Sequence, residues 1–203
     1  RGCSRGCRFC MSGCMYRPRR EVDMDTLIDT ALKCRHATGQ NRVALLGEAV
    51  SDYSRIEDLV WNLSEEGFNV VTPSLRVESV SDELLEILKS NGLKTITIAP
   101  ETTMSQRLKL NKPMSDEEII STVDRAIDLK FKVKMYLLLG TPGETTEDVM
   151  DLVNFLRNIV GRGVRYNTIK TSVNPLIPKP HTPLQYMGFD YDDIFEKYKR
   201  YSS

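Results

Sequence analysis

Short apolar runs alternate with helical stripes along most of this chain, and this alternation is the strongest constraint on its fold. The runs with strand character cover residues 43–46, 70–71, 95–99, 133–139 and 166–173. Between them, apolar residues recur at the three- and four-residue spacing of amphipathic helices. Repeated β-then-α units predict a parallel sheet joined by crossover helices, with chemistry at the carboxyl ends of the strands. We therefore expect an α/β fold.

The length of 203 residues suits one domain with a substantial core. We expect a cysteine-containing loop over residues 1–20, βα repeats over 24–175, and an extended loop with a C-terminal helix over 176–203. A further strand is expected ahead of Cys3, and the opening Arg1-Gly2-Cys3 suggests a piece of a longer protein. No apolar run reaches the length of about 18 residues that a membrane span needs. The sequence does not open with a charged segment followed by an apolar run, so a secretory signal is not supported.

The clearest helix start in the sequence lies near residue 115. Ser115 and Glu118 have the spacing of a capping box, and Met114 and Ile119 have that of a hydrophobic staple. We therefore predict that a helix begins at this point.

The neutral net charge conceals an uneven distribution. The chain has 28 basic and 28 acidic residues, which removes any global attraction to nucleic acid. Residues 1–20 nevertheless contain six arginines and no acidic residue, and they also contain four of the five cysteines. This segment is the first candidate for a functional site.

Cys3, Cys7 and Cys10 form a C-x3-C-x2-C pattern on a glycine-rich loop. Thiolates are soft ligands, and three that are closely spaced can face one metal centre. A zinc site usually needs a second Cys or His pair, and none follows. A four-iron cluster normally takes four cysteines, so three would leave one iron open to substrate. A structural zinc loop and free thiols remain alternatives.

The remaining cysteines and the histidines have simpler interpretations. Cys14 as a fourth ligand would close the cluster and indicate a non-catalytic electron carrier, although a packed or free thiol is preferred. Cys34 lies on an apolar helical stripe and is expected in the core. His36 ends the same helix, and His181 lies in a proline-rich loop.

The segment Cys-Ser-Arg-Gly-Cys-Arg-Phe-Cys at residues 3–10 resembles the signature of the radical S-adenosylmethionine superfamily, in which an aromatic residue often precedes the third cysteine. Within it, the chain is most similar to the enzymes that carry a cobalamin-binding domain. The likeness continues, in the family's order, through residues 16–21, 51–54, 73–77, 99–101, 111–112, 140–145 and 178–183. This resemblance implies a partial (βα)6 TIM-like barrel with a parallel sheet.

The resemblance also implies a chemistry. Cys3, Cys7 and Cys10 would hold three irons of a [4Fe-4S] cluster, and the fourth iron would bind the amino and carboxylate groups of S-adenosylmethionine. One electron would then release methionine and a 5′-deoxyadenosyl radical, which abstracts hydrogen from a substrate that the sequence does not identify. A reduced flavodoxin or ferredoxin would donate the electron, and cobalamin would come from a domain outside this chain. An oxygen-sensitive cluster favours the cytoplasm, and nucleic acid is a minor substrate option.

The family's cofactor contacts can be transferred to this sequence by resemblance. The Gly47-Glu48 segment would meet the amino group of S-adenosylmethionine, Lys112 its carboxylate, and Tyr136 its ribose. The remaining positions expected to lie beside the cofactor are Phe9, Ser74, Arg76, Glu101 and Gly140, of which Gly140 opens the turn beside the adenine.

Simpler interpretations of these residues stay open. Glu101 could be a charge at a helix terminus, and Lys112 could be a solvated side chain. Tyr136 could be a core residue with a satisfied hydroxyl, and Gly140 a turn former.

Overall fold

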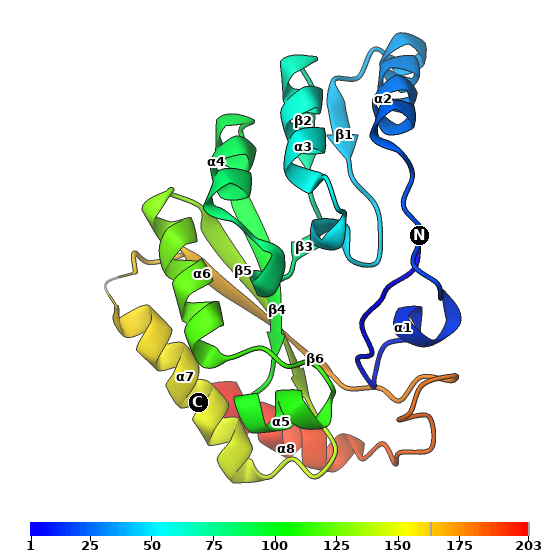
Figure 1. Ribbon diagram of the computed structural model, residues 1–203. Helices are drawn as coiled ribbons and strands as arrows, with labels where there is room; N and C mark the ends of the chain where they lie inside the picture. The colour runs from blue at the N-terminus through cyan, green and yellow to red at the C-terminus, as the bar shows by residue number, and fades with distance from the viewer. Residues whose placement is uncertain (163, 203) are drawn as a thin grey trace.

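The computed structural model describes residues 1–162 and 164–202 (Figure 1). The helices are α1 (Ser12–Met15), α2 (Met24–Thr38), α3 (Ile56–Glu65), α4 (Asp82–Ser90), α5 (Met104–Lys109), α6 (Asp116–Asp128), α7 (Thr146–Gly161) and α8 (Tyr191–Ser202). The strands are β1 (Arg42–Ala44), β2 (Asn69–Val71), β3 (Ser74–Leu75), β4 (Thr95–Glu101), β5 (Lys132–Leu139) and β6 (Ile169–Pro175). Two 3-10 turns, η1 (Val50–Asp52) and η2 (Val77–Ser79), complete the set.

All strand pairs are parallel, which confirms the predicted α/β class. β1 pairs with β2, and a second sheet has the order β3-β4-β5-β6. Only Thr72 and Pro73 separate β2 from β3, and proline has no N–H to donate to a ladder. The last strand starts at Ile169, three residues later than the sequence pattern suggested.

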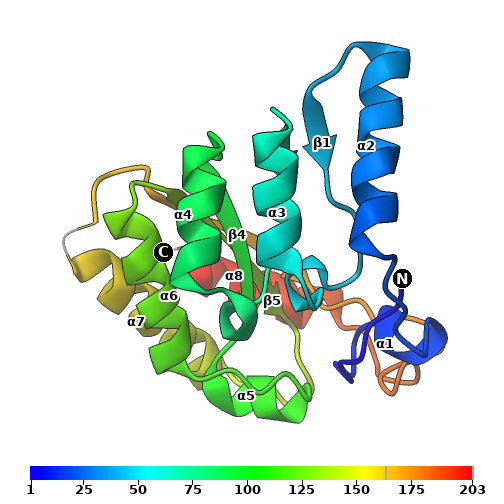
Figure 2. The same ribbon diagram turned by 45° about the horizontal axis from the view of Figure 1, so that its top comes forward.

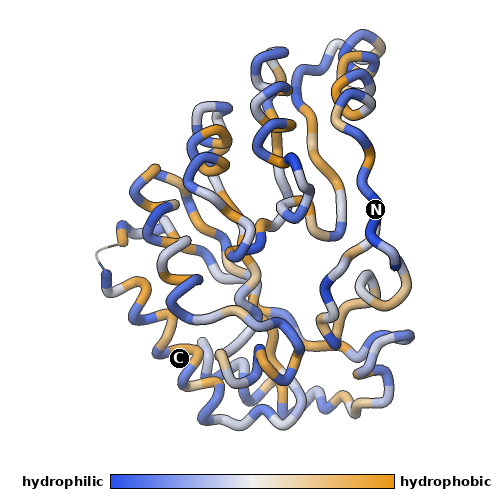
Figure 3. The backbone as a smooth tube through the Cα atoms, viewed as in Figure 1, coloured by the Kyte–Doolittle hydropathy of each residue, from blue (hydrophilic) through white to orange (hydrophobic). Residues whose placement is uncertain are grey.

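The helices cover one face of the curved array of strands (Figures 1 and 2). Along β5, Val133, Met135, Leu137 and Leu139 are buried in this face, while Lys134 and Tyr136 alternate onto the opposite, concave face. In Figure 3, hydrophobic colour recurs along the strands and alternates with hydrophilic colour along the helices. This period-two burial fixes which side chains can line the inside of the partial barrel.

Local signals in the sequence set the helix boundaries. The Ser115 hydroxyl accepts a hydrogen bond from the Glu118 N–H, and the Glu118 carboxylate accepts one from the Ser115 N–H, so the predicted capping box starts α6. Met114 and Ile119 are both buried beside it, as the staple requires.

Among the helices of the described residues, none has the length and apolar character of a membrane span.

Candidate functional site

A cavity at the carboxyl ends of β3 and β4 brings the three predicted cysteine ligands together. Its wall contains Cys3, Cys7 and Cys10 from the N-terminal loop. Six of the nine predicted cofactor positions also line it: Phe9, Glu48, Ser74, Arg76, Glu101 and Lys112. The site therefore lies where parallel α/β folds place their chemistry.

The N-terminal loop folds tightly around its cysteines. Cys3 and Cys7 are buried and Cys10 is half-buried. The Cys10 N–H donates to the Cys7 carbonyl at 3.1 Å, and the Arg5 N–H donates to the Cys3 sulfur at 3.4 Å. A Cβ atom on Gly13 would lie 2.4 Å from the Arg5 carbonyl oxygen, so α1 packs against the loop at a point where only glycine fits.

Cys14 does not share this environment. It lies on α1, is exposed, and is absent from the cavity wall. Among the described residues, no three His, Cys, Asp or Glu side chains converge closely enough to hold one metal ion. Cys3, Cys7 and Cys10 share one cavity wall, and Cys14 is not on it.

Contacts on two sides hold the loop in place. On one side, Arg5 donates to both carboxylate oxygens of Asp52, at 2.9 and 3.2 Å, and Ser79 donates to the same carboxylate at 2.7 Å. On the other side, the Arg8 N–H donates to the Leu110 carbonyl at 2.9 Å, and the Asn111 amide donates to the Gly6 carbonyl, also at 2.9 Å. The loop is therefore fixed both to η1 and to the segment that follows α5.

The pKa of Asp52 reflects this anchoring. Burial alone would raise it, but the hydrogen bonds from Arg5 and Ser79 and the charge of Arg5 together lower it below its ordinary value. The carboxylate is therefore ionised at neutral pH and able to hold the Arg5 side chain of the cysteine loop.

Glu101 and Lys112 form a buried pair at the end of β4. The Lys112 ammonium donates to a Glu101 carboxylate oxygen at 2.7 Å and to the Ala99 carbonyl at 2.6 Å. Glu101 has a φ of 67°, an uncommon backbone conformation for a residue with a side chain, and it interrupts the β4–β5 register. Lys112 is buried in the loop between α5 and α6, which contradicts its interpretation as a solvated side chain.

Arg76 is a third cation on the cavity wall, besides Arg5 and Lys112. Its N–H donates to the Ser51 hydroxyl at 3.1 Å, and its Nη2 donates to Glu78 at 2.7 Å. Burial raises the pKa of the Cys7 thiol, whereas the charges of Lys112 and Arg76 oppose that rise. Three cations, Arg5, Arg76 and Lys112, thus line one cavity with three thiols, a set that fits an anionic thiolate-bound cluster.

The structure places three predicted contacts away from this cavity. The Tyr136 hydroxyl accepts a hydrogen bond from the Lys134 ammonium at 3.1 Å on the concave face. Gly140 lies in a separate hollow beside α8, where a Cβ atom would come within 2.7 Å of Ile194. Gly47 lines a second, apolar pocket. Their roles toward a cofactor remain predictions.

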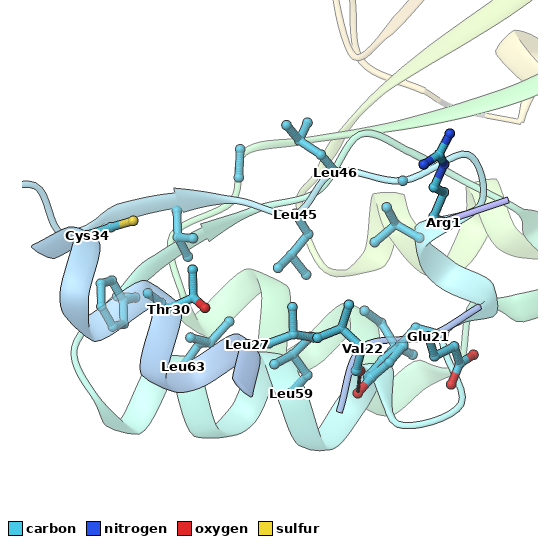
Figure 4. Close-up of a pocket in the computed structure, with 18 of the residues that line it drawn as sticks. Arg1, Glu21, Val22, Leu27, Thr30, Cys34, Leu45, Leu46, Leu59 and Leu63 are labelled. Atoms are coloured by element: carbon cyan, nitrogen blue, oxygen red, sulfur yellow. Dashed lines mark hydrogen bonds between the residues drawn. The ribbon is translucent and has the colours of Figure 1, made fainter. Parts of the chain in front are cut away.

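The apolar pocket lies between α2, α3 and β1 (Figure 4). Leu27, Leu59 and Leu63 point from the helices toward Leu45. β1 has no strand partner on its outer edge among the described residues. Cys34 lines this pocket and is exposed, so its predicted place in the core is wrong, because little packs over the apolar side of α2 here.

The sequence reasoning missed several residues that build the site. Arg5, Asp52 and Asn111 anchor the cysteine loop, yet none was assigned a role. The signal was partly present, since Asp52 and Asn111 fall inside segments that resemble the family. Their function could not be assigned because the partners lie 47 and 105 residues away along the chain.

A buried polar network connects α8 to the loop after β5. The Lys197 ammonium donates to the Glu144 carbonyl at 2.9 Å and lies 3.9 Å from the Glu144 carboxylate. That carboxylate accepts hydrogen bonds from the Gly140 N–H at 2.7 Å and from the Thr141 hydroxyl at 3.1 Å. α8 therefore holds the Gly140 turn in shape through Glu144.

The network predicts a pH dependence of stability. Burial raises the pKa of Glu144 above its ordinary value of 4.5, although the Gly140 N–H, Lys197 and Thr141 act against this rise. The folded protein therefore holds more protons at this site than the unfolded chain between the two pKa values. Because of this, the contribution of Glu144 to stability falls as pH rises through that window.

As pH rises above 4.5, we expect the free energy of unfolding of the parent chain to fall relative to that of Glu144→Gln. Urea unfolding across a pH series measures it. Glu196→Gln removes a carboxylate that pairs with Lys199 on the exposed side of α8 and serves as the control. Parallel pH curves for Glu144→Gln and the parent would contradict the prediction.

Comparisons with known proteins agree with this geometry. A family model described as the Radical SAM superfamily matches residues 1–156. The chain is 38% identical, over 195 residues, to an uncharacterized protein of Methanocaldococcus jannaschii, MJ0966, covering 94% of this chain and 42% of that protein. It is 24% identical, over 172 residues, to the ribosomal protein uS12 methylthiotransferase RimO of Leptospira biflexa, covering 78% of this chain and 38% of the relative. The chain thus spans about two fifths of the length of these relatives.

Solved structures show the same fold. The radical S-adenosylmethionine methyltransferase TsrM from Kitasatospora setae, with cobalamin and a [4Fe-4S] cluster bound, superposes with a TM-score of 0.70 at 15% identity, over 90% of this chain and 37% of that one. Methylornithine synthase (PylB) superposes with a TM-score of 0.60 at 22% identity, over 92% and 54%. With a family match over most of its length and the three cysteines on one cavity wall, this chain belongs to the radical SAM superfamily.

Proposed function

We propose that this chain is the catalytic core of a radical SAM enzyme that binds a [4Fe-4S] cluster through Cys3, Cys7 and Cys10 and reductively cleaves S-adenosylmethionine. One observation carries the proposal. The three cysteines share a cavity wall with three cations, Arg5, Arg76 and Lys112, at the carboxyl ends of adjacent parallel strands. Three thiolates leave a fourth iron free for a ligand, which is what the reaction requires.

The chain's own residues suit the polar groups of S-adenosylmethionine. The Glu48 carboxylate lies at the cavity rim and accepts a hydrogen bond from the Gly2 N–H at 2.9 Å. Hydrogen bonds from its own backbone N–H and from Gly2 lower its pKa, so it is an anion that can bind an ammonium group. Lys112 has three donors and uses two on Ala99 and Glu101, which leaves one for a carboxylate.

When bound, the cluster and S-adenosylmethionine would supply the radical chemistry, which is the one-electron reductive cleavage of S-adenosylmethionine. The protein holds the thiolate ligands rigidly through the Arg5–Asp52 and Asn111–Gly6 contacts. It also buries Cys3 and Cys7 away from water. These residues position the reactants and do not exchange protons with them.

The proposed reaction also needs an electron donor and a substrate. A low-potential donor such as reduced flavodoxin or ferredoxin would supply the electron, and the cytoplasm would keep the cluster reduced. Cobalamin bound by a further domain remains a prediction, which the cobalamin-containing TsrM structure supports only through its fold. The final substrate is open, and the likeness to a methylthiotransferase of ribosomal protein uS12 makes a methylthio or methyl transfer the first reaction to examine.

The alternative of a four-cysteine electron carrier is less well supported. It needs Cys14 as a ligand, and Cys14 is exposed outside the cavity that holds the other three cysteines. The cavity also contains the Glu101–Lys112 pair, which an electron carrier does not require.

The test is anaerobic reconstitution of the full protein with iron and sulfide, followed by addition of S-adenosylmethionine and dithionite. We expect 5′-deoxyadenosine and methionine in equal amounts, quantified by liquid chromatography and mass spectrometry. Omission of dithionite is the control and should give neither product. A protein that loads a cluster but forms no 5′-deoxyadenosine would overturn the enzyme proposal and support the electron carrier.

A further inference from the structure

Arg76 is held at the cavity wall, and one of its buried donors has no acceptor in the described part of the chain. It follows β3 directly, and Ser51 accepts its backbone N–H at 3.1 Å. Its Nη2 donates to Glu78 at 2.7 Å, which fixes one end of the guanidinium, and the side chain is only 15% exposed. Its Nε is buried and has no hydrogen-bond partner among the described residues.

A buried N–H without an acceptor costs free energy and calls for an explanation. The acidic residues nearby are already engaged. Both Asp52 oxygens accept hydrogen bonds from Arg5, and one also accepts a bond from Ser79. Glu78 is engaged by the Nη2 of the same arginine.

The Cys7 sulfur is an acceptor on the same cavity wall. Arg76 and Cys7 line the same cavity, where burial raises the pKa of the Cys7 thiol and the positive charge of Arg76 acts against that rise. Of the other cations of the wall, Lys112 donates to Ala99 and Glu101, and Arg5 donates to Asp52. Arg76 is the cation of this wall with a buried donor that has no acceptor among the described residues.

We propose that Arg76 donates an N–H···S hydrogen bond to the Cys7 sulfur, or to a sulfide of the cluster that Cys7 holds, and thereby raises the reduction potential of that cluster. The inference rests on the proposed function. Reduction adds negative charge to the cluster, and a fixed N–H donor with a positive charge stabilises the reduced form more than the oxidised one. Hydrogen bonds to the sulfurs and net charge are established determinants of cluster potential.

The test is an EPR-monitored redox titration of the reconstituted full protein without S-adenosylmethionine. At the potential where half of the parent cluster is reduced, Arg76→Met should lower the ratio of reduced to oxidised cluster about tenfold, equivalent to a shift of about 59 mV for one electron. Arg76→Lys keeps the charge but lacks the planar fork and the Nε donor, so it should recover less than half of that shift.

Arg55→Met is the matched control, because it removes an arginine that pairs with Asp58 outside the cavity. It should keep the parent potential.

Iron per chain separates the two proposals. A parent protein that binds no cluster contradicts the proposed function. A loaded Arg76→Met protein with unchanged potential contradicts only the role of Arg76. If Arg76→Met loads no iron, Arg76→Lys decides, and a parent potential in that variant overturns the N–H···S bond. A change only in S-adenosylmethionine affinity also overturns it.

Discussion

A chain in which Cys7 is replaced by alanine should lose the cluster and all cleavage of S-adenosylmethionine. Cys7 is buried, shares the cavity wall with Cys3 and Cys10, and lies near the positive charges of Lys112 and Arg76. Two remaining thiolates cannot hold a four-iron cluster that normally needs more. Loss of a residue that only hydrogen-bonds to a metal ligand already weakens metal sites by about 10- to 100-fold. We therefore expect 5′-deoxyadenosine formation to fall by at least about 100-fold when a ligand itself is removed.

Two other cysteines provide matched controls for this experiment. Cys34 is exposed on α2 and Cys14 is exposed on α1, and neither lines the cavity. Cys34→Ala and Cys14→Ala should keep the iron content, the visible spectrum and the product yield of the parent. Collapse of the cluster in Cys14→Ala would restore the electron-carrier interpretation, and an active Cys7→Ala protein would remove the basis of the proposed function.

Replacing Arg107 with methionine should cause the largest loss of stability among single substitutions near the site. Arg107 is fully buried, and its guanidinium donates to the Met114 carbonyl at 2.8 Å, to the Thr102 carbonyl at 2.6 Å and to the Asp116 carboxylate. Methionine fills part of the space but leaves these acceptors unpaired. We expect the free energy of unfolding to fall by about 3–5 kcal/mol, as for other broken buried networks.

Arg107 also shapes the site, because the segment that it fastens carries Lys112 and supports the cysteine loop through Leu110. Urea unfolding of the iron-free protein measures the stability change, and iron binding after reconstitution measures the effect on the site. Lys109→Met, on the same helix but exposed, should change stability by less than about 0.5 kcal/mol. Equal stability of Arg107→Met and Lys109→Met would contradict the role assigned to Arg107.

Hydrophobic periodicity was sufficient to predict the parallel α/β class and most elements. Thr95–Glu101 and Lys132–Leu139 are strands because β-branched and aliphatic residues alternate into the helical layer. The start of the last strand was placed too early, since Tyr166 and Asn167 precede the residues that pair with β5. Strand ends depend on pairing partners, and these are not encoded locally.

The sequence by itself predicted the three cysteines as ligands and determined the start of α6, because both patterns lie within a few positions of one another. Only the tertiary structure decided which distant side chains serve the site. It brought Arg76 and Lys112 to the cysteines, kept Tyr136 and Gly140 outside that cavity, and left Cys34 and Cys14 exposed. The physical reason is that these side chains are buried and paired only when β3, β4 and the N-terminal loop pack together. Contacts between segments so far apart in the chain cannot be predicted from a local sequence pattern.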